Sequence, residues 1–391
     1  MRILVGGYIG LYSIGGATWD YIQYPLGLHL LGHEVYYIED TMQYPVYQPK
    51  KDKWDDCSDC VAHLKNAMEQ VGLKDRWAYR DVVTGQVFGM GEQKLKDICA
   101  TADVFINVSA STFMREEYNA IPIKMLVDTD PMFTQYQYYQ LQQKGGKEAK
   151  EAEEYMKSYN LLFTFGLNIN SPDSRIPTFG FQWHPTKKPT VLNQWASVSN
   201  TRPKWGFTSI LNWIERPPFE YDNEMWGQKN VIFERFLSLP VNSGQAFDLI
   251  INTPDTEEAN RSMQRIVNRN WHVLDPYQWI PDKDSYREFI QSSFGEFSIT
   301  KETYIKSNSG WFSGRSACYL AAGKPVITQD TQWSKYIPSG QGLFACNNLE
   351  AAANAVKEIM ADYAKHSRYA QKIAAEYFDS SKVLSEMLAH I

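Results

Sequence analysis

Apolar and polar positions at the start of the chain follow a strand, helix, strand order. The apolar run Met1–Gly7 predicts a strand, and the glycine-rich stretch after it predicts a loop. Apolar residues then recur at helical spacing from Asp20 to Leu31, Gly32 ends this helix, and residues 33–39 predict a second strand. This order is typical of a parallel sheet with crossover helices.

The same alternation continues and then resumes after an interruption. Two more strands are predicted at 102–108 and 123–128, and the charged stretch 144–157 predicts a solvated helix. Residues 216–227 are rich in Pro and Trp, and they show neither a helical nor a strand period. Beyond them the pattern predicts helices at 233–239, 257–268 and 349–362 and strands at 247–252, 271–274 and 325–328.

The length of the chain agrees with two such domains. Its 391 residues exceed the ~250–300 at which one core usually stops growing. We therefore predict an α/β fold of two Rossmann-like, doubly wound domains facing across a cleft, with ligands at the carboxyl ends of the two parallel sheets. The predicted domains are 1–220 and 221–370, and residues 371–391 are expected to cross back to the first domain as a helix.

Composition narrows the classes of function. With 43% hydrophobic and 21% charged residues the chain is predicted to fold, and its 14% aromatic residues suit sugar rings and nucleobases as well as core packing. The net charge of −6 gives no overall attraction to phosphate backbones, so nucleic acid is not expected as a partner. No apolar run approaches the ~20 residues that span a bilayer, and we expect a cytoplasmic protein.

The cysteines include one isolated C-x-x-C pair. Cys57 and Cys60 lack a second pair at zinc-finger spacing, and the aspartates around them are expected to raise the thiol pKa values. We therefore predict neither a metal site nor a redox role for this pair.

Residues 309–327 are the most informative segment for ligand binding. Neither a G-x-G-x-x-G nor a P-loop motif follows the first strand, so a cofactor of those classes is not expected. The segment instead predicts a glycine-rich loop, a short helix beginning near Gly314, and a strand. Free amides at such a helix start, with Arg315 and the hydroxyls of Ser313 and Ser316, suit a diphosphate. The alternative is a capped helix with one solvated arginine.

Several short motifs resemble those of GT-B glycosyltransferases. The run Tyr319–Ile327, with residues 342–344 and the helix behind them, looks like the donor-binding half of these enzymes, where AAGxPVI and GL recur. The GHEV at 32–35 is similar to that of their acceptor-binding half. The resemblance covers both domains. It implies a nucleoside-diphosphate sugar bound mainly by the second domain and an acceptor held by the first.

One feature departs from the family pattern. Many retaining members carry two glutamates eight positions apart, at places held here by Gly310 and Cys318. Their acidic contacts to ribose and sugar are therefore missing, and Arg315 and Ser316 take the diphosphate in our interpretation. The donor sugar and the stereochemical outcome stay open.

The resemblance implies further donor-binding residues. Asp330 and Thr331 follow the next strand, where these enzymes present polar groups to phosphate or sugar hydroxyls, and a capped turn is the alternative. Trp271, His272 and Tyr277 lie in the region that flanks the base, and one of the three is expected to stack on it.

An inverting transfer needs a base, and the first domain offers three carboxylates. Asp20 is the predicted base because it stands at the start of the first helix, from where family members point a base to the acceptor; the alternative role is to complement the helix dipole. Asp128 and Asp130 end a central strand and come next, with turn formation as the alternative. The predicted acceptor-binding residues are Gly15, Gly16, Asp128, Asp130 and His184.

The predicted function is transfer of a sugar from a nucleoside-diphosphate sugar to a small-molecule, glycan or other acceptor, with Asp20 and Arg315 as the catalytic residues. No metal is expected, because the D-x-D triplet at 128–130 lies in the first domain and metal-independent members stabilise the departing diphosphate with protein donors. Three alternatives stay open: a non-catalytic sugar- or nucleotide-binding protein of this fold, a nucleotide-sugar epimerase, and a DNA-modifying glycosyltransferase with a local basic groove.

Overall fold

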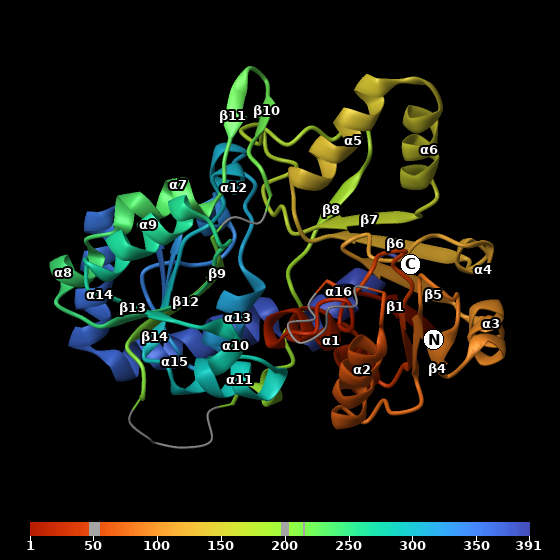
Figure 1. Cartoon of the computed structure of the whole chain (residues 1–391), viewed down its shortest axis with the longest axis horizontal. Coiled ribbons are helices and arrows are strands. Elements are labelled where there is room, and N and C mark those ends of the chain that lie inside the picture. The colour runs from red at the N-terminus through yellow and green to blue at the C-terminus, as the bar shows by residue number, and fades with distance from the viewer. Residues whose placement is uncertain (47–54, 197–202, 214–215) are drawn as a thin grey trace. The chain divides into compact units, whose positions relative to one another are not determined.

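The computed structural model describes residues 1–46, 55–196, 203–213 and 216–391, and these form two compact units (Figure 1). The first unit comprises Met1–Phe165, Pro177–Val191 and Ser380–Ile391, and the second comprises Gly166–Ile176 and Leu192–Asp379. Each unit is built on a largely parallel sheet whose strands alternate with helices, which confirms the predicted α/β class with two doubly wound domains.

The strands of the first unit are β1 (Arg2–Gly6), β2 (Glu34–Glu39), β3 (Trp77–Arg80), β4 (Val87–Gly89), β5 (Val104–Val108), β6 (Ile123–Asp128), β7 (Leu161–Thr164) and β8 (Trp183–Pro185). Its helices are α1 (Gly15–Leu30), α2 (Ser58–Gln70), α3 (Glu92–Thr101), α4 (Glu116–Asn119), α5 (Phe133–Lys144), α6 (Gly146–Lys157) and α16 (Ser380–Leu388). The described strands pair in the order β4-β3-β2-β1-β5-β6-β7-β8, and only β4 runs antiparallel to its neighbour. The order reverses between β1 and β5, so their carboxyl ends form the switch point at which such sheets bind ligands.

Helix α1 starts earlier than the pattern predicts. It begins at Gly15 rather than near Asp20, because burial of Thr18 and Trp19 in the first turns compensates for the weak helix propensity of the two glycines. At its other end α1 packs against α16, where a Cβ on Gly27 would lie 2.6 Å from Leu384. The last helix thus belongs to the first unit, whereas residues 371–379 stay with the second.

The strands of the second unit are β9 (Phe207–Asn212), β10 (Phe219–Tyr221), β11 (Glu224–Trp226), β12 (Phe247–Asn252), β13 (Trp271–Leu274), β14 (Gly295–Ser298), β15 (Val326–Gln329) and β16 (Leu343–Cys346). Its helices are α7 (Lys229–Phe233), α8 (Leu239–Ser243), α9 (Glu257–Val267), α10 (Pro276–Trp279), α11 (Lys283–Ser292), α12 (Glu302–Lys306), α13 (Gly314–Ala321), α14 (Leu349–Ala361) and α15 (Tyr363–Ile373). β10 and β11 form a hairpin, and the other described strands form a parallel sheet in the order β13-β12-β9-β14-β15-β16. Its switch point lies between β9 and β14.

The predicted boundary at 220/221 lies inside the second unit, because β9 pairs with both β12 and β14 at the centre of the second sheet. The pattern did not predict β9, since Thr208 and Ser209 interrupt its apolar run. Both are buried, and their hydroxyls bond to Tyr319 and to the carbonyl of Phe297. The chain enters the second unit briefly at residues 166–176 and passes into it again at 191/192.

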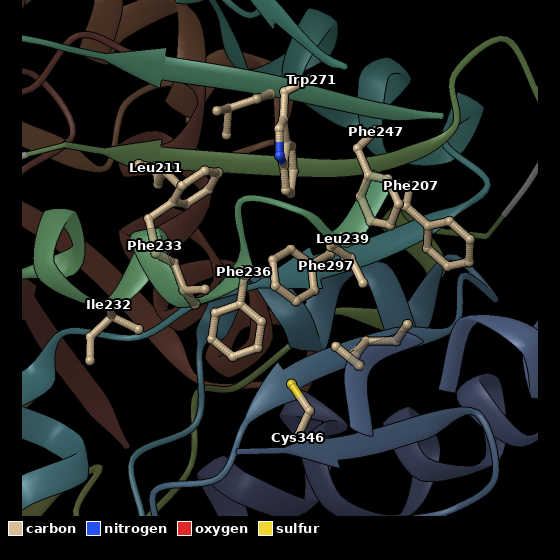
Figure 2. Close-up of a cluster of buried hydrophobic side chains, with 14 of the residues drawn as sticks. Phe207, Leu211, Ile232, Phe233, Phe236, Leu239, Phe247, Trp271, Phe297 and Cys346 are labelled. Atoms are coloured by element: carbon tan, nitrogen blue, oxygen red, sulfur yellow. The ribbon is translucent and has the colours of Figure 1, made fainter. Parts of the chain in front are cut away.

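The core of the second unit lies between one face of its sheet and the helices α7, α8, α9 and α14 (Figure 2). Alternate strand residues such as Phe207, Phe247 and Phe297 point into it, so Thr208, Glu296 and Ser298 point to the opposite face, where α13 packs. None of the helices described has the length and apolarity to cross a bilayer.

Candidate functional site

The N-terminus of α13 lies next to the switch point of the second sheet, because this helix connects β14 to β15 and packs on both. Ser313 precedes it with an extended backbone, but the Ser313 side chain accepts no hydrogen bond from the first turn. Within the described chain the amides of Gly314 and Arg315 also donate to no acceptor. Such unpaired N–H groups at the positive end of a helix are suited to an anion.

Arg315 is held in place by a buried carboxylate. Its Nε lies 2.7 Å from Oε1 of Glu296, and its Nη2 donates to Oγ of Ser298 at 2.7 Å. Glu296 is fully buried in β14, whereas the Arg315 side chain is 16% exposed. The ion pair offsets part of the positive charge that we predicted for phosphate binding, but it fixes the guanidinium in one orientation. Nη1 makes no hydrogen bond within the described residues, and this nitrogen is available to a ligand.

Three buried polar atoms in β14, in the loop after it and in α13 have no hydrogen-bond partner among the described residues. They are Oε2 of Glu296, Oγ1 of Thr300 and Oγ of Ser316. An unpaired buried polar group costs about 1–3 kcal/mol, so it calls for a ligand or a water molecule to satisfy it. Sequence reasoning missed Glu296, Ser298 and Thr300, although the polar residues that alternate through the end of this strand were a signal.

An aromatic pair and a lysine fix the loop before α13. Trp311 stacks on Tyr304, with ring centres 4.3 Å apart and planes inclined by 20°. Nζ of Lys301 lies 5.4 Å from the centre of the same Tyr304 ring, and Lys301 is buried just after β14. Lys301, which the sequence did not single out, adds a cation at the carboxyl end of this strand.

The geometry does not support base stacking by two of the three aromatic candidates. Trp271 is a core residue whose ring packs against Phe233 and Phe247, and its Nε1 donates to the carbonyl of Leu237 (Figure 2). His272 is the second residue of its strand and pairs with Asp248 near the amino end of β12, whereas ligands bind at carboxyl ends.

Tyr277 stands where a stacking residue is expected. It lies on α10 directly after β13, so it follows the carboxyl end of that strand. Its backbone amide donates to the carboxylate of Asp275, and its side chain is 47% exposed. Base stacking by Tyr277 stays a prediction.

Asp330 and Thr331 join loops rather than present open polar groups. The Asp330 carboxylate accepts the amide of Gln332 at 2.9 Å and the Ser334 hydroxyl at 2.6 Å, which is the capped turn that the sequence left as the alternative. Thr331 is buried, and its hydroxyl donates to the carbonyl of Trp311. Their contact to a donor sugar is therefore not supported by the geometry. Thr331 positions the loop before α13, whereas Asp330 caps its own turn.

The structure explains why one family glutamate is replaced by Gly310. This glycine has a φ of 71°, and a Cβ there would lie 2.5 Å from the backbone nitrogen of Asn168. A glutamate cannot fit against that backbone. The second position, Cys318, is buried inside α13.

A second candidate site lies at the switch point of the first sheet. The loop after β5 lies against Gly6 at the end of β1. A side chain at position 6 would overlap the hydroxyl of Thr112 in this loop. In that loop Ser109 and Ala110 have φ angles of 60° and 51°. Two successive non-glycine residues in this left-handed conformation are strained, and such strain concentrates at functional sites.

A chain of hydroxyl groups crosses this switch point. The Tyr21 hydroxyl donates to Oγ of Ser109 at 3.1 Å, and Ser109 Oγ lies 2.6 Å from Oγ1 of Thr129. Burial raises the pKa of Tyr21 well above its ordinary value, so the phenol stays protonated at neutral pH. Sequence reasoning missed these residues, although the small polar residues directly after the predicted strand 102–108 were a signal.

The loop between β1 and α1 is tied down by a buried carboxylate. Glu39 accepts the amide of Gly10 at 2.8 Å and that of Leu11, and the Tyr37 hydroxyl lies 3.4 Å from it. Burial raises the pKa of Glu39 to about 7 despite these hydrogen bonds. The loop leads into Gly15 and Gly16, the first two residues of α1, whose N-cap Ile14 offers no side-chain acceptor.

The predicted base Asp20 is part of an ion pair. Its carboxylate accepts a hydrogen bond from Nζ of Lys188, which is almost fully buried, while Asp20 itself is 57% exposed. Asp20 therefore has a defined orientation and stays open to water. Its role as a base stays a prediction.

The two aspartates after β6 differ sharply. Both oxygens of Asp128 are used: they accept the Asp130 amide and the side chains of Thr134, Gln135 and Thr164 at 2.6–3.1 Å. Asp128 thus joins β6, β7 and α5, and these contacts do not support its predicted role in acceptor binding or as a base. Asp130 is partly exposed, and its role as a base or in acceptor binding stays a prediction.

His184 has a packing role. It lies on the edge strand β8 with its ring 4.3 Å from that of His390 and 5.5 Å from that of Phe163. Burial, and then His390, lowers the pKa of His184. These contacts do not support the predicted acceptor role.

The cysteines are free thiols, and all of them are buried. Burial, with Asp81 adding to it, raises the pKa of Cys57 to about 12, so the aspartate that matters is not one of those near in sequence. Among the described residues no group of three or more His, Cys, Asp or Glu side chains could hold a metal ion.

Comparison with known proteins identifies the fold. No family model and no curated protein sequence matches the chain. The structure of Anabaena HepE in complex with UDP-glucose is similar at a TM-score of 0.57 and 12% identity, over 100% of both chains. Sucrose-phosphate synthase from Thermosynechococcus elongatus is similar at 0.51 and 10% identity, over 100% of this chain and 98% of that one. AviGT4, a glycosyltransferase involved in avilamycin A biosynthesis, is similar at 0.50 and 9% identity, over 100% and 96%. The chain has the GT-B fold of glycosyltransferases, as its motifs predicted.

Proposed function

We propose that this protein is a glycosyltransferase that moves a sugar from a nucleoside-diphosphate sugar to an acceptor without a bound metal. The observation that carries the proposal is the α13 N-terminus, whose unpaired amides lie beside Arg315 and the unpartnered Ser316 hydroxyl at a switch point. Anabaena HepE, which shares the fold, has been solved with UDP and with UDP-glucose, so UDP-sugars are the first donors to test.

The donor half of the proposal rests on charge. When the bond between the sugar and the diphosphate breaks, negative charge grows on the departing phosphate oxygen. Several groups can donate hydrogen bonds to this oxygen: the amides of Gly314 and Arg315, Nη1 of Arg315 and Oγ of Ser316. Lys301 adds a cation nearby. Because Glu296 and Ser298 already fix the guanidinium, little reorganisation is needed during the reaction.

The acceptor half of the proposal lies in the first unit. Asp20 takes the proton of the attacking hydroxyl, and its ion pair with Lys188 holds the carboxylate in one orientation. Tyr21, Ser109 and Thr129 offer hydroxyl groups that can bond to those of an acceptor. Asp130 is the alternative base.

Thermal unfolding in the presence of nucleotide sugars tests the proposal directly. A ligand at about 100 times its Kd should add about 2.7 kcal/mol of stability, which a shift in Tm reveals. We expect UDP and at least one UDP-sugar to raise Tm, and the same sugar nucleotide to release UDP when acceptors are supplied. If no nucleotide raises Tm, the donor site is wrong; if the sugar is epimerised without transfer, the protein is an epimerase.

A further inference from the structure

The first unit carries a cluster of aromatic side chains that the candidate site does not use. Tyr136, Tyr138 and Tyr139 on α5 meet Phe179 and Phe181, which lie just before β8. We call these five side chains the aromatic platform.

The rings of the aromatic platform are arranged as a row. Tyr136 and Tyr139 are stacked with centres 6.3 Å apart, and Tyr139 and Phe179 are stacked at 6.4 Å, with planes inclined by 29° and 21°. Tyr138 lies 5.0 Å from Phe179 and 5.5 Å from Phe181. The rings of Tyr136, Tyr139 and Phe179 are therefore nearly parallel, whereas the Tyr138 ring is tilted by 51° to Phe179 and lies edge-on to Phe181.

The platform is not part of a closed core. Phe179 is 38% exposed, and the other four side chains are only partly buried. One exposed ring surrounded by four partly exposed rings gives an aromatic surface that a ligand can reach.

Phe179 is held in a strained turn. Its φ is 52°, Gly180 follows with a φ of 78°, and the Phe181 amide donates to the carbonyl of Thr178 at 3.0 Å. A bulky residue is an outlier in this left-handed region, where glycine fits without strain. The turn nevertheless places a large ring against Tyr138 and Tyr139 at the surface, and retained strain points to function.

The segment of α5 that carries the tyrosines of the platform is uncharged and rich in amides. Residues 133–143 contain no Asp, Glu, Lys or Arg, and glutamines alternate with the tyrosines. The charged groups of α6 that lie nearest to Tyr138 are Glu153 and Lys157, and these form an ion pair with each other. The platform therefore matches a neutral ligand that carries many hydroxyl groups.

We propose that the aromatic platform binds a neutral glycan chain that serves as the acceptor. Ring faces pack against the C–H faces of sugar rings, and the Gln137 and Gln140 amides bond to sugar hydroxyls. A membrane surface fits less well, because a membrane-binding helix needs Lys or Arg on its polar face and Leu, Phe or Trp on the other. The inference rests on the proposed function, since it names the acceptor class.

The position of α5 agrees with this role. The helix begins soon after Asp130, at the carboxyl end of β6, and runs for 12 residues, which is about 18 Å. A glycan lying along it would extend away from the candidate acceptor site, so the platform holds the chain while one end reacts.

Affinity electrophoresis tests the platform without any donor. The full chain is run through native gels containing dextran, soluble starch, hydroxyethyl cellulose or galactomannan, and we expect at least one polysaccharide to retard it. Phe179→Ala should weaken this retardation about tenfold, the effect of losing one aromatic contact. The control is Tyr336→Ala, which removes an aromatic side chain of similar exposure, 39%, from the other unit and should leave retardation unchanged.

Phe179→Gly separates binding from folding. Glycine accepts the backbone of the turn, so Tm should stay equal or rise while retardation is lost. A lower Tm with unchanged retardation would show that Phe179 serves packing and would overturn the proposal. So would equal mobility of all variants in every gel, or binding of the wild type only to phosphatidylglycerol vesicles. UDP binding is measured on the same proteins: UDP binding without glycan binding overturns the platform alone, and the reverse overturns the transferase.

Discussion

Nε of Arg315 and Oε1 of Glu296 lie 2.7 Å apart in the second unit, and the glutamate is fully buried. The pair joins the first turn of α13 to β14. Desolvation offsets much of the attraction in a buried ion pair, so its main contribution here is orientation. In our proposal Arg315 meets the diphosphate, and Glu296 is its positioning residue.

The first prediction concerns the stability of this pair. Arg315→Ala leaves the Glu296 carboxylate buried without its cation, and we expect the free energy of unfolding in urea to fall by about 3–5 kcal/mol. The double variant Arg315→Met with Glu296→Leu should recover most of this loss. The folded double variant should still turn over about 10²–10³ times more slowly than the wild type, the cost of one preorganised donor. Wild-type turnover in it would remove Arg315 from the mechanism.

The second prediction uses the unpartnered Ser316 hydroxyl. Ser316→Ala removes a buried polar group that has no partner among the described residues, so stability should stay equal or rise. If that hydroxyl binds a phosphate, UDP affinity measured by calorimetry should fall about tenfold or more. Thr190→Val is the matched control, because it removes a buried unpartnered hydroxyl from the first unit and should leave UDP affinity unchanged.

The third prediction is that transfer does not require a metal. Helix amides and Arg315 supply the donors for the diphosphate, so activity in EDTA should equal activity without it. Complete loss in EDTA with recovery on adding Mn²⁺ or Mg²⁺ would contradict the role given to Arg315. UDP affinity in EDTA serves as the control for donor binding.

The fourth prediction concerns Asp20 as the base. Asp20→Asn keeps the shape and one acceptor for Lys188 but cannot take a proton, so turnover should fall by about 10²–10⁴ with UDP-sugar affinity unchanged. Asp130→Asn is measured in parallel. If Asp20→Asn keeps activity and Asp130→Asn loses it, the base is Asp130 and Asp20 only pairs with Lys188.

The fifth prediction follows from Glu39, whose pKa is about 7 in the folded chain against an ordinary value of 4.5. Between these values the folded state binds more protons than the unfolded state, so stability must fall as pH rises through this window. The stabilisation is about 3 kcal/mol below pH 4.5, and its loss is nearly complete at pH 7. Urea unfolding at pH 4.5 to 8 should show this decrease in the wild type and lack it in Glu39→Gln. Parallel curves for the two proteins would contradict the raised pKa.

The amino-acid sequence by itself determined the class of the fold, and it predicted the position of one candidate site. The sequence predicted β1, β2, β5 and β6 from their apolar runs, and α1 and α14 from their helical period. This was possible because local spacing decides which residues can share a face. The loop and helix around Gly314 were readable for the same reason, since their glycines and small residues permit few other backbone paths.

Only the tertiary structure decided what each functional group is paired with. Glu296 and Arg315 are 19 residues apart in the sequence, and Asp20 and Lys188 are 168 residues apart. Neither ion pair can therefore be predicted from a local sequence pattern. Trp271 is similar: its ring suits a nucleobase, but the packing of Phe233 and Phe247 buries it. Polarity in a sequence shows that a side chain needs a partner. Whether that partner is a ligand, water or another residue depends on which strands become neighbours. Strand β9 is an example, because its buried polar residues have partners only since β9 lies at the centre of the second sheet.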